Sequence, residues 1–179
     1  MKSNLAGMVL FALLSAVLSL RAQDSVTTLA GQALISGMTN GPATNAVFND
    51  PAALVADAAG NLYIADSQNH VIRKIGTNGL VSTFAGQAGT PGSNNGSGLQ
   101  AQFDTPSGIA IAPNGYFYVS DTGNHIIRKI TSAADVSTIA GLAGQSGFTN
   151  GIGSAARFDS PLGITVGTNG TIYVADSGN

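Results

Sequence analysis

Short runs of apolar residues alternate with turn sequences along most of the chain. In the stretch 106–140 there are four such runs, each of five or six residues and rich in the Ile, Val, Tyr and Phe typical of β-strands. They cover residues 108–112, 116–120, 125–130 and 135–140. The first two runs are apolar at almost every position, as in strands that are covered on both faces, whereas the last two include charged and hydroxyl side chains. The pattern predicts four consecutive strands and no helix.

Turn residues between the first two runs predict that neighbouring strands are antiparallel. Asn114-Gly115 and Asn169-Gly170 stand at this place, and Gly60-Asn61 occupies it earlier in the chain. Asn-Gly pairs tolerate the positive φ of a tight hairpin turn. We therefore expect the first two strands to form a hairpin.

The pattern recurs every 55 residues without an insertion. The segment Asp121–Ile130 (DTGNHIIRKI) matches Asp66–Ile75 (DSQNHVIRKI), and Asp176–Asn179 (DSGN) begins a third copy. Self-similarity at a fixed period is the signature of a repeat architecture. Other residues that keep the same spacing are Phe48, Phe103 and Phe158, then Pro51, Pro106 and Pro161, and Gly31, Gly86 and Gly141.

Four antiparallel strands per repeat are typical of a β-propeller blade, whereas the coils of a solenoid carry one or two strands. We predict an all-β domain over residues 23–179, with repeats 48–102, 103–157 and 158–179 and a leading outer strand at 26–31. In a blade, the chain runs back and forth from the axis outward. The turn after each second strand and the long loop to the next blade then share one face, which we call the loop face.

The recurring residues resemble the NHL repeat, with the pattern F-x-x-P-x-G-I…N-G-x-x-Y-V-A-D-x-G-N-H-x-I-R-K-I. Ala53 and Gln68 replace two of its glycines in the first copy. The resemblance covers nearly all of the chain after residue 22, and it implies a β-propeller, commonly six-bladed, used as a binding platform and in some members as an enzyme. In the second copy the matching residues are Phe103, Pro106, Gly108, Ile109, Gly115, Tyr118, Asp121, Gly123, Asn124, His125, Ile127 and Ile130.

The number of repeats is smaller than a closed ring needs. Of the 179 residues, 157 follow the first 22 (179 − 22), which is fewer than three periods of 55, whereas propellers typically close with roughly 4–8 blades. We expect about three blades of a six-bladed propeller and the front portion of a protein of ~330 mature residues. The second interpretation is that several short chains assemble into one ring.

The first 22 residues have the pattern of a secretory signal peptide. Lys2 supplies the positive start, residues 5–20 are apolar, and Ala22 precedes a possible cleavage site. An uncleaved membrane anchor is the alternative, but the apolar run is shorter than the roughly 20 residues of a spanning helix. We expect a secreted or periplasmic protein that has no membrane span after cleavage.

Charge argues against nucleic acid as a partner. Without residues 1–22 the chain has five basic residues (seven less Lys2 and Arg21) against nine aspartates, a formal charge of −4. Nucleic-acid binding requires a basic face. The pairs Arg73-Lys74 and Arg128-Lys129 form no such face, because neighbouring residues of a strand point to opposite sides. We interpret them as charges on outer strands that oppose edge-to-edge association.

The Asp-x-x-Asn-His turns are the clustered polar groups of the sequence. On the loop face they would form a ring of carboxylates and imidazoles able to bind a polar ligand or a cation. Asp and Asn side chains also commonly stabilise turns, and repetition in every blade favours this structural role. The candidate ligand-binding residues are Asp66, Asn69, His70, Asp121, Asn124, His125, Asp176 and Asn179.

The loops 86–102 and 141–157 are rich in Gly, Ser and Asn, and we predict flexible connections between blades. They lack the strand-to-helix setting and the lysine of a phosphate-binding loop. They differ most between the copies, and loops of this kind can carry ligand specificity.

These patterns favour a binding or scaffold module over an enzyme. We predict a protein or glycan ligand on the loop face, no cofactor, and no catalytic or metal-binding residue; the oligomeric state is left open. The alternative that the resemblance implies is a metal-dependent lactonase or lyase of the gluconolactonase-like type, with a central divalent cation. Such sites draw unequal ligands from several blades, whereas this chain has no Glu and both of its histidines lie in the repeated turns.

Overall fold

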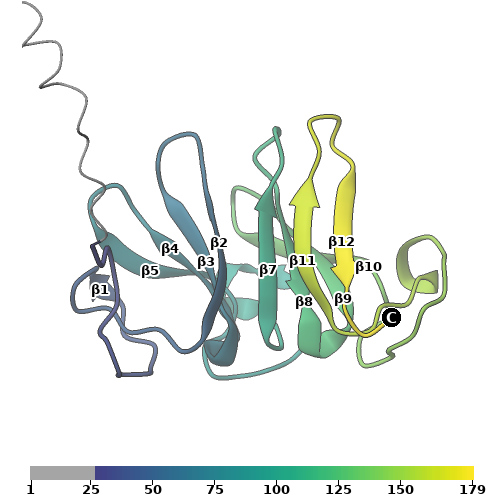
Figure 1. The fold of residues 1–179 in the computed structure, drawn as a ribbon, viewed down its shortest axis with the longest axis horizontal. Helices are drawn as coiled ribbons and strands as arrows, with labels where there is room; N and C mark the ends of the chain where they lie inside the picture. The colour runs from purple at the N-terminus through teal and green to yellow at the C-terminus, as the bar shows by residue number, and fades with distance from the viewer. Residues whose placement is uncertain (1–26) are drawn as a thin grey trace, which may run out of the picture.

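The computed structural model describes residues 27–179, so the segment 1–22 that we predict to be a signal peptide lies outside the described residues. Blade 1 contains β2 (Pro51–Ala56), β3 (Leu62–Asp66), β4 (Val71–Ile75) and β5 (Leu80–Ala85). Blade 2 contains β7 (Pro106–Ile111), β8 (Phe117–Asp121), β9 (Ile126–Ile130) and β10 (Asp135–Ala140), and blade 3 contains β11 (Pro161–Val166) and β12 (Ile172–Asp176). Consecutive strands within each blade pair antiparallel, which confirms the predicted all-β fold with four strands per repeat (Figure 1).

The long loops contain more regular structure than the sequence predicts. Each complete blade gains a fifth short strand at its outer edge, where β1 (Gly41–Pro42) pairs with β5 and β6 (Gly96–Ser97) pairs with β10. The Asn95 side chain holds loop 86–102 to blade 2 by accepting the Thr138 N–H at 3.0 Å. The prediction of a flexible connection is therefore wrong for loop 86–102, which pairs with β10 through β6. Four single 3₁₀ turns complete the elements: η1 (Ser67–Asn69), η2 (Gly98–Gln100), η3 (Thr122–Asn124) and η4 (Gly153–Ala155).

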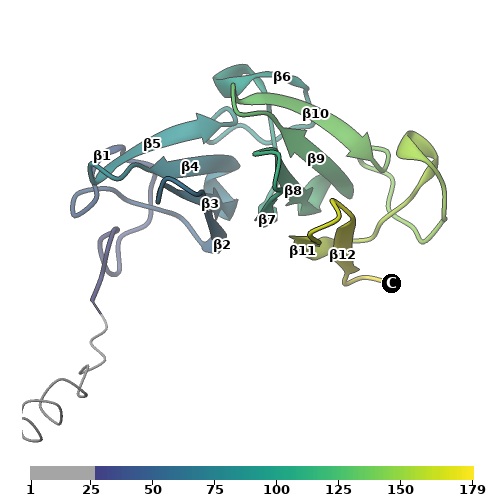
Figure 2. The same ribbon diagram turned by 90° about the horizontal axis from the view of Figure 1, so that it is seen from above.

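The three sheets stand side by side in an arc (Figure 2). The first strands of the blades lie on the inner side of the arc, where β7 contacts β2 on one side and β11 on the other, and β5 and β10 lie on the outer side. Of the leading strand predicted at 26–31, residues 27–31 are described and form no strand. No helix within residues 27–179 is long and apolar enough to cross a membrane.

The hairpin turns at one end of the blades are of the type that the sequence predicts. Gly60, Gly115 and Gly170 adopt φ of 87°, 80° and 83°, a region that costs a side chain several tenths of a kcal/mol or more and that glycine enters freely. The turn in blade 2 closes with the Ala112 N–H bound to the Tyr116 carbonyl at 2.8 Å. The three hairpin tips lie at one end of the molecule, opposite the turns that follow β3, β8 and β12 (Figure 1).

Apolar side chains fill the space between blades 1 and 2. Tyr63, Phe84 and Phe117 form an aromatic cluster with ring centroids 4.3–5.4 Å apart. Phe103 is fully buried in the same core, together with side chains of β3, β4, β8 and β9. The blades are thus held together by sheet-on-sheet packing rather than by disulfides, since the sequence has no cysteine.

One buried hydroxyl interrupts this packing. Ser120 is fully buried, and its Oγ makes no hydrogen bond to any residue from 27 to 179. The corresponding residues of the other copies are Ala65 and Ala175. An unsatisfied buried polar group costs about 1–3 kcal/mol. We expect Ser120→Ala to raise the free energy of unfolding by about 0.5–2 kcal/mol, measured by urea denaturation. Ser107→Ala, which removes a hydroxyl bound to the Thr105 carbonyl, is the matched control and should not stabilise the protein.

Candidate functional site

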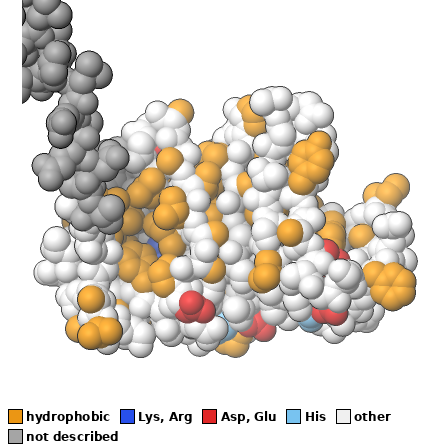
Figure 3. Space-filling view, in the orientation of Figure 1, with side chains coloured by type: hydrophobic (Ala, Val, Ile, Leu, Met, Phe, Trp, Pro, Cys, Tyr) orange, Lys and Arg blue, Asp and Glu red, His pale blue; other side chains and the backbone are white. Residues whose placement is uncertain are grey.

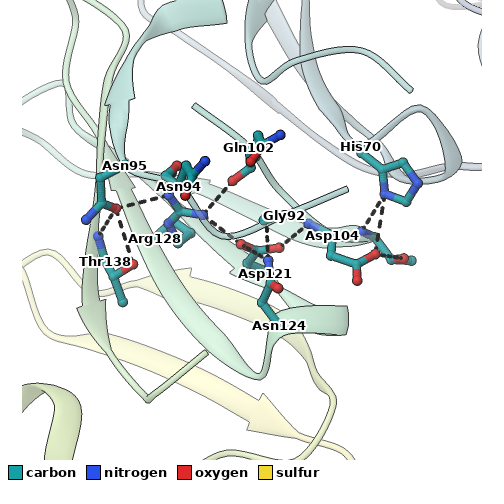
Figure 4. A network of polar contacts seen from close by, with 11 residues as sticks. His70, Gly92, Asn94, Asn95, Gln102, Asp104, Asp121, Asn124, Arg128 and Thr138 are labelled. Atoms are coloured by element: carbon teal, nitrogen blue, oxygen red, sulfur yellow. Dashed lines mark hydrogen bonds and ion pairs between the residues drawn. The ribbon is translucent and has the colours of Figure 1, made fainter. Parts of the chain in front are cut away.

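The repeated turn of blade 2 is built around the buried carboxylate of Asp121 (Figure 4). Its Oδ1 accepts the Asp104 N–H at 2.7 Å, which ties the inter-blade loop to the turn. Its Oδ2 accepts the Asn124 amide at 2.9 Å and Nη1 of Arg128 at 2.8 Å. Both oxygens of Asp121 are therefore bound within the protein.

Arg128 reaches this carboxylate from β9 and is itself fully buried. Its guanidinium lies over the Phe103 ring, 5.0 Å from the centroid. Strand alternation places Arg128 toward the loop 86–102, whereas Lys129 stays partly exposed. The remaining acceptors come from that loop: the Gln102 carbonyl at 2.7 Å, the Asn94 carbonyl at 2.9 Å and the Asn95 Oδ1 at 3.1 Å.

Blade 1 repeats the arrangement. Asp66 accepts the Asn49 N–H at 2.7 Å, the Asn69 amide at 2.8 Å and Nη1 of Arg73 at 2.8 Å. Arg73 is also fully buried and binds the corresponding loop groups. The interpretation of these arginines as outer-strand charges against association is therefore wrong. They join each second-strand turn to the preceding loop.

Burial and the neighbouring groups act in opposite directions on the ionisation of the Asp121 carboxylate. Burial raises the pKa of Asp121 to about 6, while Arg128, the Asn124 amide and the Asp104 N–H act in the opposite direction. At pH 7 the carboxylate is thus mostly charged, and it is the one acidic partner of the Arg128 guanidinium within residues 27–179. The Asp, Asn and Arg groups of blades 1 and 2 hold the loop face together.

Unlike the buried Asp, Asn and Arg groups, the histidines lie at the boundary between two blades. His70 adopts φ of 57°, and its Nδ1 accepts the Thr105 N–H of the next blade at 3.1 Å. The same nitrogen lies 3.4 Å from the Asp104 carboxylate, and the side chain is 17% exposed. Since Nδ1 is an acceptor, the neutral ring carries its proton on Nε2. Nε2 makes no hydrogen bond to any residue from 27 to 179, so it is available to a ligand.

The contact recurs one blade further on. His125 Nδ1 accepts the Ser160 N–H at 3.0 Å and lies 3.5 Å from the Asp159 carboxylate. Histidine and acidic side chains accordingly alternate along the lower edge of the molecule in Figure 3, which is the loop face. The structure therefore brings each candidate histidine beside an aspartate of the following blade that the sequence reasoning did not select.

A glycine makes room for this pairing. A Cβ at Gly123 would lie 2.6 Å from the Asp104 carboxyl carbon, and one at Gly178 would lie 2.5 Å from that of Asp159. In blade 1 the glycine is replaced by Gln68, and Asn49 stands at the position of the aspartate. The copies that have a glycine in the turn also have an aspartate at the facing loop position, and this pairing in the sequence could have identified Asp104 and Asp159.

The third turn has the same internal contacts. Asp176 Oδ1 accepts the Asp159 N–H at 2.8 Å, and the Asn179 amide binds Asp176 Oδ2 and, at 2.9 Å, the Gly147 carbonyl. Asp176 and Asn179 are more exposed than their equivalents in blades 1 and 2. Of the candidate residues, the structure thus leaves the two histidines and this third turn accessible.

The end of the molecule opposite the loop face, where the hairpin turns lie, contains a cavity. A cavity of about 620 Å³ is lined by hairpin residues of all three blades, including Asp57, Tyr63 and Phe117. The Asn61 side chain is the main cause that lowers the pKa of Asp57, which also accepts two backbone N–H groups. The sequence reasoning missed this residue. The sequence does distinguish Asp57 from its equivalents, because Ala112 and Gly167 occupy the same position in the other copies.

Comparison with known proteins agrees with the repeat pattern. The NHL repeat family matches residues 103–130 and 158–179. Human NHL repeat-containing protein 2 is 37% identical over 113 residues, which cover 62% of this chain and 15% of that protein. The chloroplastic protein SUPPRESSOR OF QUENCHING 1 of Arabidopsis thaliana is 34% identical over 128 residues, which cover 65% and 12%. The chain thus matches less than a sixth of the length of these two relatives.

Solved structures share the fold. A protein of unknown function from Bacteroides thetaiotaomicron superposes with a TM-score of 0.71 at 25% identity, over 87% of this chain and 38% of that one. An auxiliary nutrient binding protein from the same species has a TM-score of 0.60 at 24% identity, over 69% and 34%. With its 55-residue pattern, its antiparallel four-stranded blades and these relatives, the chain belongs to the NHL-repeat family of β-propeller proteins.

Proposed function

We propose that this chain is an exported binding module that holds a protein or glycan ligand on the loop face. The observation that carries the proposal is the repeated histidine–aspartate pair at successive blade boundaries, His70 with Asp104 and His125 with Asp159. The apolar segment 1–22 supports export to the periplasm or the cell exterior.

Each pair offers a ligand both kinds of hydrogen-bonding group. The neutral imidazole presents an Nε2–H donor, because its Nδ1 is engaged by the backbone of the next blade. The Asp104 and Asp159 carboxylates are 35% and 37% exposed and act as acceptors. Sugar hydroxyls and peptide amides both need donors and acceptors in alternation, which this face supplies at a regular spacing.

The backbone next to each pair is held in an uncommon conformation. Thr105 and Ser160, whose N–H groups bind the histidines, adopt φ of 50° and 54°. A β-branched residue such as threonine rarely adopts positive φ, and such strain is maintained only where the surroundings impose it. The histidines are thereby fixed in orientation before a ligand arrives, which lowers the entropic cost of binding.

The enzymatic alternative has no comparable support among the described residues. A lactonase or lyase of the kind considered would need several acidic or histidine ligands around a divalent cation. Residues 27–179 contain no group of three or more His, Cys, Asp or Glu side chains that could hold a metal ion. We therefore assign no metal ligand and no catalytic residue within residues 27–179.

The test uses the full-length chain against an array of neutral and acidic oligosaccharides and a random peptide display library. Ligands selected by the unmodified chain should bind the double variant His70→Ala/His125→Ala at least about tenfold more weakly. Asp57→Asn, which changes a carboxylate on the hairpin face, is the control and should bind as the unmodified chain does. Selected ligands that ignore the histidine substitutions, or the lack of any selected ligand, would contradict the proposal.

A further inference from the structure

One nitrogen of each loop-face histidine lies within reach of two groups that require opposite protonation states of the ring. His70 Nδ1 accepts the Thr105 N–H at 3.1 Å and lies 3.4 Å from Oδ1 of Asp104 (Figure 4). An unprotonated nitrogen accepts from the amide but has no proton to give the carboxylate, whereas a protonated nitrogen donates to the carboxylate and cannot accept from the amide. The two hydrogen bonds are therefore mutually exclusive.

The geometry of this contact belongs to the neutral ring. The Thr105 N–H is directed at His70 Nδ1, which it could not be if that nitrogen also carried a proton. Oδ1 of Asp104 accepts the Thr105 hydroxyl at 3.1 Å instead. Thr105 thus binds the histidine with its backbone and the aspartate with its side chain, and it holds two acceptor atoms close together without a proton between them.

The whole arrangement recurs at the next blade boundary. The Ser160 N–H binds His125 Nδ1 at 3.0 Å, and the Ser160 hydroxyl donates to Oδ1 of Asp159 at 3.2 Å. The distance from His125 Nδ1 to this carboxylate is 3.5 Å. A hydroxyl residue thus stands between histidine and aspartate at both boundaries, so the repeat preserves all three groups and not the histidine alone.

The other charged groups of these turns are already neutralised within the protein. Each turn holds a buried aspartate–arginine ion pair with an N–O distance of 2.8 Å. The pairs are Asp66–Arg73 beside His70 and Asp121–Arg128 beside His125. Among residues 27–179, Asp104 is the one carboxylate within 4.0 Å of His70 Nδ1. A proton on this nitrogen therefore has a single acidic partner.

We propose that protonation of His70 and His125 switches the loop face between two hydrogen-bonding states and releases its ligand in acid. The proton comes from solvent and enters at Nδ1. Each ring then forms an ion pair with the neighbouring aspartate, and the N–H of Thr105 or Ser160 loses its acceptor. Histidine ordinarily changes charge between about pH 5 and 8. The ligand in this inference rests on the proposed loop-face function, whereas the switch itself does not.

The two states offer a ligand different groups. In the neutral state the face presents the Nε2–H donor and the Asp104 carboxylate with its full charge. In the protonated state the imidazolium compensates that charge and occupies Oδ1. Thr105, which adopts φ of 50° while its N–H is bound, is then free to leave this strained region. A ligand that uses the carboxylate thus loses an acceptor and the fixed orientation of the boundary.

Nuclear magnetic resonance of the ¹⁵N-labelled full-length chain tests the switch without a ligand. At about pH 8 both imidazoles should carry their proton on Nε2. Between about pH 8 and pH 5, the exchange protection of the Thr105 and Ser160 N–H groups, relative to an unstructured peptide at the same pH, should fall at least about tenfold. The Asp104 N–H reports separately on Asp121, which it binds and whose pKa of about 6 lies in the same range.

Two variants assign the response to its groups. His70→Asn removes the titrating ring, and asparagine tolerates the φ of 57° at this position. The acid response should then vanish at Thr105 and persist at Ser160, so that each boundary is the control for the other. Asp104→Asn, which places here the residue that blade 1 has at Asn49, should move the response of Thr105 to lower pH because the charged ring loses its partner.

The outcomes separate the switch from the loop-face function. A proton on Nδ1 at about pH 8, protection that stays constant while the rings titrate, or a Thr105 response that survives in His70→Asn would overturn the switch. Ligands selected on the loop face should bind at least about fivefold more weakly at about pH 5 than at about pH 7.5, both to the unmodified chain and to the hairpin-face control Asp57→Asn. Binding that ignores pH would overturn the release by acid. The absence of any selected ligand would contradict the loop-face proposal, while the resonance measurements still decide the switch.

Discussion

Replacing Asp121 with alanine is expected to lower the free energy of unfolding by about 3–5 kcal/mol. The carboxylate is fully buried and is the only acidic partner of Arg128 among residues 27–179. Its removal leaves a buried guanidinium without a counter-charge and takes an acceptor from the Asp104 N–H and the Asn124 amide. Urea denaturation of the full-length chain measures the loss.

Asp135→Ala is the control, since this aspartate is exposed, and it should change the free energy of unfolding by less than about 0.5 kcal/mol. The double variant Asp121→Ala/Arg128→Met should lose less than the sum of the two single variants, because it leaves no charge unpaired. A loss below about 1 kcal/mol for Asp121→Ala would show that the loop carbonyls alone satisfy Arg128, and it would contradict the role given to the carboxylate.

The second large effect is expected at Phe103. This side chain is fully buried between blades 1 and 2. The centroid of its ring lies 5.0 Å from the guanidinium carbon of Arg128. Phe103→Ala removes the ring, leaves a cavity and deprives the cation of its aromatic contact. We expect a loss of about 3–5 kcal/mol in the free energy of unfolding, measured by the same urea titration.

Phe148→Ala is the matched control because the Phe148 ring is 84% exposed, and its effect should stay within about 0.5 kcal/mol. The contribution of the cation–aromatic contact is separated by Phe103→Leu, which keeps most of the apolar volume and removes the π-face. If Phe103→Ala and Phe148→Ala destabilised the protein equally, burial between the blades would not be the cause.

Much of the frame could be predicted from the sequence because its signals are local. The apolar runs and the Asn-Gly turns predict strands and hairpins, and β7 to β10 lie within two residues of the predicted ranges. The 55-residue period then requires that each copy fold alike, and Asp66 and Asp121 do occupy equivalent places. A regular spacing of strands and turns is thus enough to specify a blade.

The loops and the buried charges could not be predicted in the same way. Alternation along β9 shows that Arg128 and Lys129 point to opposite faces, but it does not show which face a loop covers. The covering groups come from loop positions 26 to 34 residues earlier in the chain. Sequence reasoning therefore predicts that a polar loop is flexible, because the arginine that binds the loop is identified only in the tertiary structure.

The sequence by itself determined the repeat, the strands, the hairpin turns and the acidic character of the chain, because each depends on neighbouring residues and on composition. Only the tertiary structure decided that the arginines are buried and that each histidine meets an aspartate of the next blade. These features arise where separate repeats pack together. Contacts across that boundary depend on distances in space that no local pattern encodes.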